Sequence, residues 1–520
     1  MTVLNIRVVG MVLLSGILAG CAGLPDRAGI KAGHALTDTT QTRLGREVST
    51  AYSAKEAGEG KSLFYVLSNG LDAFAARVAL ADMADRSIDF QYYIYRKDLT
   101  GRLITFKLLE AADRGVRVRM LLDDFDTDNV DEDILALDQH PNIEVRLFNP
   151  FNRITSRLNQ VFTSKNPVTR RMHNKSFTVD NQVTILGGRN IADEYFNADP
   201  AFKFADVDVV GAGSVAQDVS TAFDLYWNSE LTYPIGSLVR KKISDKDVKK
   251  HRRQLLDFVA ENSKSDYVKA LGNSDFAKKI INDKIPWAWG RAHVIFDNPN
   301  KIRVSIHDSE YSLMPQLHPY IMDLKSELVI FSPYFIPGKK GSDFLIDLVS
   351  KGVKVRILTN SLISTDVGVV YAAYAKYRKK MLRGGVELYE MNRHLSRDER
   401  DEIRGKENGS SKASLHAKSF VLDRKRVFIG SLNLDARSVV QNTEIGVVID
   451  SAEIAKQMAE AFDANIGRMA FKVGIDGNTV TWTESTAGGN SIVHRNTPYA
   501  GLWRRFSAWF MRFLPGETLL

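Results

Sequence analysis

The fold of this chain is decided by the stretch HNKSFTVD at residues 173–180, which returns as HAKSFVLD at residues 416–423. Each copy passes through a turn into an apolar segment that ends in glycine, VTILGGRN at 183–190 and VFIGSLN at 427–433. The histidine, lysine, aspartate, glycine and asparagine positions share one offset, 416 − 173 = 243 residues. So many coincident polar and glycine positions indicate an internal duplication.

Flanking segments repeat as well. Residues 87–93 resemble residues 328–334, and residues 115–121 resemble residues 352–358. A helical apolar pattern separates the two segments in each half. Strands that alternate with helices predict βαβ units and a largely parallel sheet. We therefore expect an α/β fold with two similar domains, related by a pseudo-twofold axis, and a catalytic cleft between them.

Length and composition agree with several folded units. At 520 residues the chain exceeds one ordinary domain, and its 44% hydrophobic and 25% charged residues exclude a wholly disordered or fibrous protein. The expected parts are a signal peptide at 1–20, a tether at 21–60, an N-terminal α/β domain at 61–235, a basic helical insert at 236–300, a C-terminal α/β domain at 301–470 and an extension with an amphipathic tail at 471–520.

The chain is mildly basic. Lys and Arg number 70 against 62 Asp and Glu, a net charge of +8. This excess suits an anionic partner such as phosphate, lipid headgroups or nucleic acid, without choosing among them. Part of it lies in RKKISDKDVKKHRR at residues 240–253. That run is either a solvated helix face or a patch facing anionic lipid.

The N-terminus is typical of a targeting segment. Arg7 precedes an apolar run that ends Leu18-Ala19-Gly20-Cys21, too short for a confident transmembrane helix. Cys21 is the only cysteine, which excludes intrachain disulfides and cysteine-based metal sites. Its position resembles a bacterial lipobox and predicts lipidation at Cys21; the alternative is a plain signal peptide with a chance cysteine. Loss of Arg7 would leave a mature charge of 8 − 1 = +7.

The repeated motif carries suitable chemistry for phosphate. Alternation along a strand places His173 and Lys175 on one face, and likewise His416 and Lys418. Lysine neutralises phosphate oxygens, and histidine offers a nucleophile or a proton donor. A pseudo-twofold axis would bring both pairs to one cleft, where one histidine attacks phosphorus and the other protonates the leaving oxygen.

Other motif positions have supporting roles. Asp180 and Asp423 belong to the motif and are grouped with its catalytic residues, although their place at a turn favours backbone bonding. Gly188 and Ser431 allow close backbone approach to a phosphate, and Asn190 and Asn433 supply amide donors to its oxygens.

The pattern His-x-Lys-x4-Asp-x6-Gly-Gly/Ser-x-Asn, present twice, resembles the phospholipase D superfamily over roughly residues 65–470. The strings RRMHNKSFTVD, VRLFNPF, GRNIADEYF and SLHAKSFVLD, with the tail LPGETLL, are most similar to bacterial cardiolipin synthases of the C type. This resemblance implies a two-step phosphatidyl transfer through a phosphohistidine, without metal or cofactor. By analogy His173 is the nucleophile and His416 the acid and base; sequence symmetry leaves the reverse open.

The resemblance also implies an acidic residue that orients each histidine. Glu444 fits in the second half. Asp206 takes that place in the first half, with a turn residue at a strand end as the alternative. A carboxylate behind histidine fixes the tautomer and stabilises imidazolium.

The expected function is a membrane-associated phosphatidyltransferase that makes cardiolipin from phosphatidylglycerol and a second phospholipid, with phosphatidylethanolamine a candidate. Alternatives are a phospholipase D-type hydrolase or other phosphodiesterase, with a nuclease less favoured, and a lipoprotein scaffold without chemistry. The expected partners are phospholipids and a membrane surface, not nucleic acid, and the expected state is a monomer. By resemblance to lipoprotein sorting rules, Ala22 favours the periplasmic side of the outer membrane.

The C-terminal tail is short, aromatic and basic. Trp503, Phe506, Phe510 and Phe513 share one helical face, which is typical of an interfacial helix. The alternative is a helix packed on the catalytic core. Two lookalike motifs are rejected: Gly211–Ala216 mimics a dinucleotide fingerprint without a matching repeat, and the acidic residues from Asp124 lack the glycine and glutamate of a calcium loop.

Overall fold

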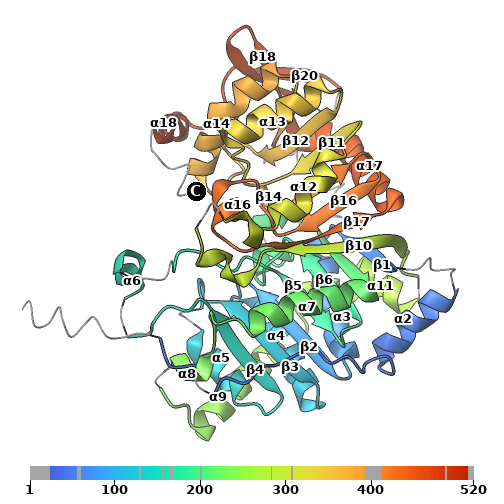
Figure 1. The fold of residues 1–520 in the computed structure, drawn as a ribbon, viewed down its shortest axis with the longest axis vertical. Helices are drawn as coiled ribbons and strands as arrows, with labels where there is room; N and C mark the ends of the chain where they lie inside the picture. The colour runs from blue at the N-terminus through green and yellow to red at the C-terminus, as the bar shows by residue number, and fades with distance from the viewer. Residues whose placement is uncertain are drawn as a thin grey trace, which may run out of the picture.

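The computed structural model describes residues 24–27, 29–54, 60–127, 130–154, 156–163, 168–199, 202–239, 241–282, 284–305, 308–392, 412–486 and 489–512. Two α/β halves are stacked along the long axis, the N-terminal half below and the C-terminal half above (Figure 1). The two-domain expectation is confirmed.

The N-terminal half is built on a mixed sheet. Its parallel strands are β2 (Ser87–Tyr92), β3 (Arg117–Asp123) and β4 (Ile143–Phe148). Its antiparallel strands are β1 (Lys61–Leu67), β5 (Ser176–Val179), β6 (Val183–Gly187), β8 (Asp208–Ala212) and β9 (Thr232–Pro234). Helices α3 (Gly70–Met83) and α4 (Leu99–Asp113) bury Phe74 and Leu108 with Phe90 in one core, while α7 (Ser214–Trp227) packs on the opposite face.

The C-terminal half repeats this plan. Its parallel strands are β11 (Glu327–Phe331), β12 (Lys354–Asn360) and β13 (Glu387–Met391). Its antiparallel strands are β15 (Ser419–Leu422), β16 (Arg426–Gly430) and β17 (Ile445–Asp450). Its helices are α12 (Met314–Met322), α13 (Gly338–Ser350), α14 (Gly368–Arg383), α16 (Ala436–Val440) and α17 (Ala452–Met469). The expected largely parallel sheet is wrong for both halves, because each motif forms an antiparallel hairpin.

The two halves share one sheet. Strand β10 (Ala288–Phe296) pairs antiparallel with β1 on one side and with β17 on the other. A second ladder joins β7 (Phe202–Ala205) to β14 (Lys412–Leu415). Helices α7 and α17 bury their apolar faces in one core between the halves. These connections fix the position of one half against the other.

The segment between the halves differs from the expected helical insert. Helices α8 (Ile235–Leu238), α9 (Asp245–Asn262), α10 (Asp266–Gly272) and α11 (Asp275–Ile281) come first, but strand β10 follows, so the segment is not helical to residue 300. On α9, His251 contacts Asp133 and Arg252 contacts Asp113. Part of the basic run therefore pairs with acidic residues of the N-terminal half rather than facing lipid.

The expected tether is wrong for the part that the structure describes. Leu24 and Ile30 pack against the N-terminal core, and the backbone amide of Gly33 donates to Asn228. Helix α2 (Arg43–Ala54) follows. The segment therefore lies on the N-terminal half. Cys21 and the expected signal peptide fall outside the described residues.

The C-terminal extension continues the second sheet. Strand β18 (Ala470–Asp476) pairs with β13, and β19 (Thr479–Ser485) and β20 (Ser491–His494) follow in order. Helix α18 (Leu502–Met511) ends the described chain, and Phe513 lies beyond it. The remaining short elements are α5 (Asp131–Asp138), α6 (Arg157–Thr163), η2 (Asp193–Tyr195), η3 (Pro299–Ile302) and η4 (Ser309–Tyr311). Among all these described helices, none is long and apolar enough to cross a bilayer.

Candidate active site

Each motif histidine is attached to the other half of the chain. The backbone amide of His173 donates to the carbonyl of Thr443 (2.8 Å), and that of His416 donates to the carbonyl of Ala205 (2.8 Å). The strands β5 and β15 begin only after the lysines, at Ser176 and Ser419. The expected strand alternation at His173–Lys175 is therefore wrong, because this extended segment bonds the opposite half instead of its own hairpin.

The orienting carboxylates cross between the halves. Nδ1 of His173 lies 2.8 and 3.1 Å from the two carboxylate oxygens of Glu444. Nδ1 of His416 lies 2.5 Å from Oδ2 of Asp206. Both carboxylates are buried. A carboxylate acceptor fixes the proton on Nδ1 and leaves Nε2 as the reactive nitrogen of each ring.

Both lysines lie in the same cluster. Nζ of Lys175 donates to the carbonyl of His173 (2.6 Å), and Nζ of Lys418 donates to that of His416 (2.5 Å). Nζ of Lys418 also lies 2.9 and 3.2 Å from the two ring nitrogens of His416. The predicted meeting of two His-Lys pairs is what the structure shows.

Burial and mutual charge shift every ionisable group of this cluster. Burial and then the two lysine charges hold the pKa of His173 well below its usual value. The same causes lower the pKa of His416. Burial lowers the pKa of Lys175 to about 7 and that of Lys418 to about 8. Burial also raises the pKa of both carboxyls, that of Glu444 to about 7. We assign a positive charge to each lysine, a negative charge to Asp206 and to Glu444, and no charge to the histidines. The net charge of the buried cluster is then zero.

Equivalent motif positions support the two carboxylates differently. Oγ of Ser431 donates to Oε2 of Glu444 (2.5 Å). At the matching position, a Cβ added to Gly188 would lie 2.2 Å from Oδ1 of Asp206. Glycine is therefore needed there because the carboxylate occupies the space that a side chain would fill. Close approach at Gly188 was predicted, but toward a phosphate rather than toward Asp206.

The two asparagines have different surroundings. Nδ2 of Asn190 donates to the hydroxyl of Tyr195 (2.9 Å), and its Oδ1 accepts from the backbone amide of Ile94 (3.2 Å). Oδ1 of Asn433 is buried and has no hydrogen-bond partner in the described part of the chain. Phosphate binding by these amides stays a prediction, and for Asn190 it requires release from Tyr195.

The motif aspartates lie at the far end of their strands from the histidines. Oδ1 of Asp180 accepts from the backbone amides of Arg86 and Ser87 (both 2.8 Å). Asp423 accepts the amides of Ser326 and Glu327 in the same way. These hydrogen bonds hold each hairpin turn against the start of the neighbouring parallel strand. The backbone bonding that their place at a turn favoured is what both residues show, and their grouping with the catalytic residues stays a prediction.

Aromatic rings around the histidines were missed from sequence. Tyr93 packs edge-on against His173 with ring centres 4.9 Å apart, and Nζ of Lys175 lies 5.4 Å from its ring centre. Tyr195 and Phe204 contact His416 at 5.0 and 4.7 Å. The sequence did contain a signal for them, because each repeat has a tyrosine after its first parallel strand: Tyr93 follows β2 and Tyr334 follows β11.

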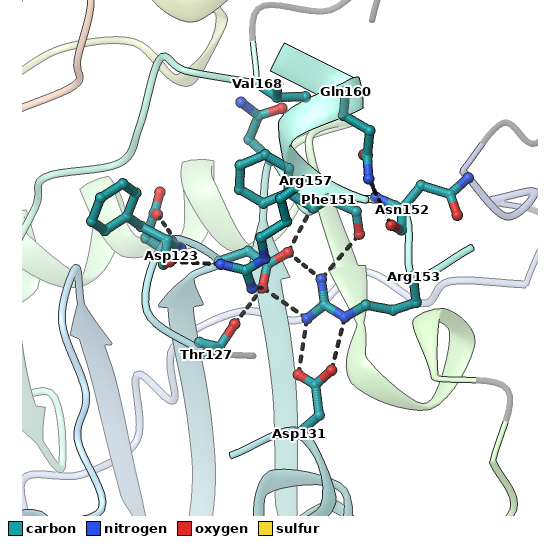
Figure 2. A network of polar contacts seen from close by, with 12 residues as sticks. Asp123, Thr127, Asp131, Phe151, Asn152, Arg153, Arg157, Gln160 and Val168 are labelled. Carbon is teal, nitrogen blue, oxygen red and sulfur yellow. Dashed lines mark hydrogen bonds and ion pairs between the residues drawn. The ribbon is translucent and has the colours of Figure 1, made fainter. Parts of the chain in front are cut away.

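The acidic loop after β3 buries one of its carboxylates. Asp124 is fully buried, accepts from the backbone amide of Phe151 (2.7 Å) and pairs with Arg153. Figure 2 shows Arg153 also bonded to Asp131. Asp128, the third residue of the calcium lookalike, lies outside the described residues. The described carboxylates of this loop serve as partners of arginine.

Comparisons with known proteins agree with this geometry. The family model described as "Cardiolipin synthase, PLD-like domain" matches residues 78–227 and 317–466, so each match contains one motif. Cardiolipin synthase C of Escherichia coli (strain K12) is 40% identical over 463 residues, which cover 89% of this chain and 97% of that protein. An uncharacterized protein of Helicobacter pylori (strain ATCC 700392 / 26695) is 33% identical over 96% of this chain and 97% of its own length.

A solved structure shares the fold. The crystal structure of phosphatidylserine synthase from Haemophilus influenzae Rd KW20 matches with a TM-score of 0.56, covering 91% of this chain and 100% of that chain. At 13% sequence identity, this likeness concerns the fold alone. The sequence resemblance to the phospholipase D superfamily is thus confirmed.

Proposed function

This chain belongs to the cardiolipin synthase family of phospholipase D-like proteins, and on that premise we propose that it transfers a phosphatidyl group between phospholipids and makes cardiolipin. The acceptor is phosphatidylglycerol, and the donor is a second phosphatidylglycerol or phosphatidylethanolamine. The observation that carries the proposal is the crossed pairing of His173 with Glu444 and of His416 with Asp206 in one buried cluster.

The first step forms a covalent intermediate. Nε2 of His173 attacks phosphorus, the bond from phosphorus to the headgroup oxygen breaks, and His416 donates a proton to that oxygen. The headgroup leaves as glycerol or ethanolamine. Glu444 stabilises the positive charge that the imidazole gains when its nitrogen bonds phosphorus.

In the second step His416 acts as a base and His173 is the leaving group. His416 takes the proton of a phosphatidylglycerol hydroxyl, whose oxygen attacks phosphorus while the phosphorus–nitrogen bond breaks. Cardiolipin leaves and His173 is neutral again. Hydrolysis would follow the same path with water in place of the hydroxyl and would yield phosphatidic acid.

The surroundings of the two rings support this division of roles. Both lysines donate to the backbone carbonyl of their own histidine, and the ammonium of Lys418 lies in addition beside both ring nitrogens of His416. That ammonium keeps His416 neutral until a substrate anion raises its pKa, which suits a group that takes up and releases a proton. A ring held at Nδ1 by both carboxylate oxygens of Glu444 suits attack through Nε2.

The charge of the substrate favours uptake from solvent of the proton that the mechanism needs. The free cluster is balanced with both histidines neutral, so a bound phosphodiester adds one negative charge to it. That charge favours protonation of one histidine, because an anion nearby raises an imidazole pKa. We therefore propose that substrate binding itself charges His416 for the first step.

We also propose that the enzyme works at a membrane surface as a lipoprotein of the bacterial envelope. Cys21 is the lipid attachment point in this proposal, on the periplasmic side of the outer membrane. Helix α18 supports it from the structure, since Trp503 and Phe506 are 78% and 51% exposed. Exposed Trp and Phe beside Arg are typical of helices that lie in a lipid interface.

The test is product analysis with defined lipids. Purified protein is incubated with vesicles of phosphatidylglycerol, with or without phosphatidylethanolamine, and the products are resolved by mass spectrometry. Cardiolipin with free glycerol or ethanolamine supports transfer, and its loss in His173→Ala supports the site. Phosphatidic acid as the sole product would identify a hydrolase instead, and cleavage of DNA without lipid turnover would identify a nuclease.

A further inference from the structure

Most of the large apolar side chains that are exposed on the described surface gather in two groups. One group lies on helix α18 and the other on and around helix α6, and together they make up more than half of the exposed large hydrophobic residues there. The first group consists of Leu502, Trp503, Phe506, Trp509 and Phe510. The second consists of Phe125, Ile154, Leu158 and Val161. Clustered exposure of this kind marks an interaction surface rather than chance.

Helix α18 turns its polar contacts inward and its rings outward. Arg504 donates to the carbonyl of Thr365 (3.1 Å) and Arg505 to that of Thr497 (2.8 Å), while Ala508 is buried against the core. The rings of Trp503 and Phe506 stack at 5.7 Å on the solvent side. The arginines thus hold the helix to the C-terminal half and leave its aromatic face uncovered.

Helix α6 is held in the same manner. Gln160 exchanges two hydrogen bonds with the backbone of Asn152, and Nη1 of Arg157 donates to the carbonyl of Phe125 (2.7 Å). Figure 2 shows Arg157 and Gln160 directed at this network. The exposed surface of the helix presents Leu158, 72% exposed, and Val161. A rigid polar network therefore displays an apolar ridge.

An aromatic path leads from this ridge to the reaction centre. The ring of Phe125, half exposed, stacks on Tyr93 at 5.5 Å, and Tyr93 packs against His173 at 4.9 Å. The same loop also supports the catalytic segment, since Asp123 accepts from the backbone amide of Met172 (2.8 Å) directly before His173. The ridge and the nucleophile are thus parts of one connected structure.

The two helices that carry the exposed apolar residues, α18 and α6, lie on the same side of the molecule (Figure 1). In Figure 1 helices α18 and α6 stand at the left, α18 above and α6 below, and β14, which leads into His416, lies between them in height. The ridges belong to different halves and border the side where the two halves meet. A broad surface that touched both ridges would face the boundary that contains the histidines.

We propose that helix α6 with Phe125, together with helix α18, forms one bilayer-contacting surface that straddles the active site and passes phospholipid from the membrane to His173. The inference rests on the proposed function. Lipid is favoured over a second copy of the chain because Trp and Phe are flanked by arginine, the composition that prefers a lipid interface. It also explains why an apolar ridge is fixed beside the reactive histidine.

The test adds one tryptophan reporter at a time to the full-length protein, which has six tryptophans of its own. Leu158→Trp places a reporter on helix α6, and Met322→Trp places a matched one on helix α12, where the side chain is 50% exposed. Met322 lies just before β11, at the amino end of the parallel strands, and the site lies at their carboxyl end. Both proteins are mixed with phosphatidylglycerol vesicles that contain brominated phosphatidylcholine, and quenching beyond the wild-type background is measured.

We expect at least twofold stronger quenching for Leu158→Trp than for Met322→Trp. Equal quenching, or none at Leu158→Trp, overturns the proposal. A wild-type dimer that becomes monomeric in Leu158→Ser also overturns it, because the ridge would then be an interface between copies.

A second measurement separates this inference from the proposed function. Leu158→Ser is compared with Met322→Ser on vesicles and on short-chain phosphatidylglycerol below its micelle concentration. We expect Leu158→Ser to lose about tenfold of the vesicle rate and to keep the rate on dispersed substrate. Equal rates of both variants on vesicles contradict the inference. If wild type forms no product from either substrate, the proposed function fails, while quenching still reports the surface.

Discussion

Replacing Glu444 by glutamine removes the negative charge of this side chain and keeps its shape. Glutamine has nearly the volume of glutamate, so the position next to His173 stays filled. The substitution removes the negative charge 2.8 Å from Nδ1 of His173 and leaves Ser431 a neutral acceptor. The positive charge that His173 gains in the covalent intermediate then lacks its counter-charge.

The charges of the ring and of the carboxylate are each spread over several atoms, so their centres lie farther apart than the 2.8 Å contact. Two unit charges about 4 Å apart interact by about 4 kcal/mol at an effective dielectric constant of about 20. A neutral hydrogen bond from Nδ1 of His173 to the glutamine carbonyl recovers about 1 kcal/mol of this. The remaining loss of about 3 kcal/mol in transition-state stabilisation corresponds to a fall in kcat of about a hundredfold, since each factor of ten costs about 1.4 kcal/mol.

The assay is steady-state cardiolipin formation with kcat and KM determined separately, together with thermal unfolding. The matched control is Glu390→Gln, because Glu390 is equally buried but pairs with Arg378 and Trp482 inside the C-terminal half. We expect the control to lower the melting temperature while kcat stays within about threefold. A Glu444→Gln protein with wild-type kcat would refute the role given to the crossed carboxylate.

Three further outcomes follow from the structure. Burial lowers the pKa of Lys175 to about 7 and of Lys418 to about 8; an amine above its pKa is neutral, so kcat/KM should fall as pH rises through 7 to 8 in a pH–rate profile. Gly188→Ala should cost at least about tenfold in kcat, measured on vesicles, because the new Cβ displaces Asp206. Asp180→Asn should lower the free energy of unfolding by about 2 kcal/mol in urea titrations without changing kcat, since the carboxylate of Asp180 accepts the backbone amides of residues 85–87 at the start of β2.

The duplication and the motif residues were readable from sequence because the repeat keeps one offset. That offset places His173 and His416 at equivalent positions, and a twofold arrangement follows from it. The crossed carboxylates were not readable in the same way. Asp206 is 210 residues from His416, and Glu444 is 271 residues from His173, so no local pattern indicates which histidine each one contacts.

The errors in the fold have physical causes. Residues 24–54 are rich in small and polar residues, which indicated a tether, yet scattered residues such as Leu24 and Ile30 suffice to pack the segment on the N-terminal half. The alternation that indicated a strand at His173–Lys175 was misleading, because strand β5 begins at Ser176 and the backbone amide of His173 bonds Thr443 in the other half. Long-range pairing of this kind leaves no signature in the local sequence.

The most direct measurement of the central claim is a burst experiment with phosphatidyl-p-nitrophenol, whose leaving group needs no proton from the enzyme. In His416→Ala, His173 should still attack phosphorus and release one equivalent of nitrophenolate, and turnover should then stop because the base for the second step is missing. Mass spectrometry should locate the phosphatidyl adduct on His173. A burst in His173→Ala, or an adduct on His416, would contradict the assignment of the nucleophile.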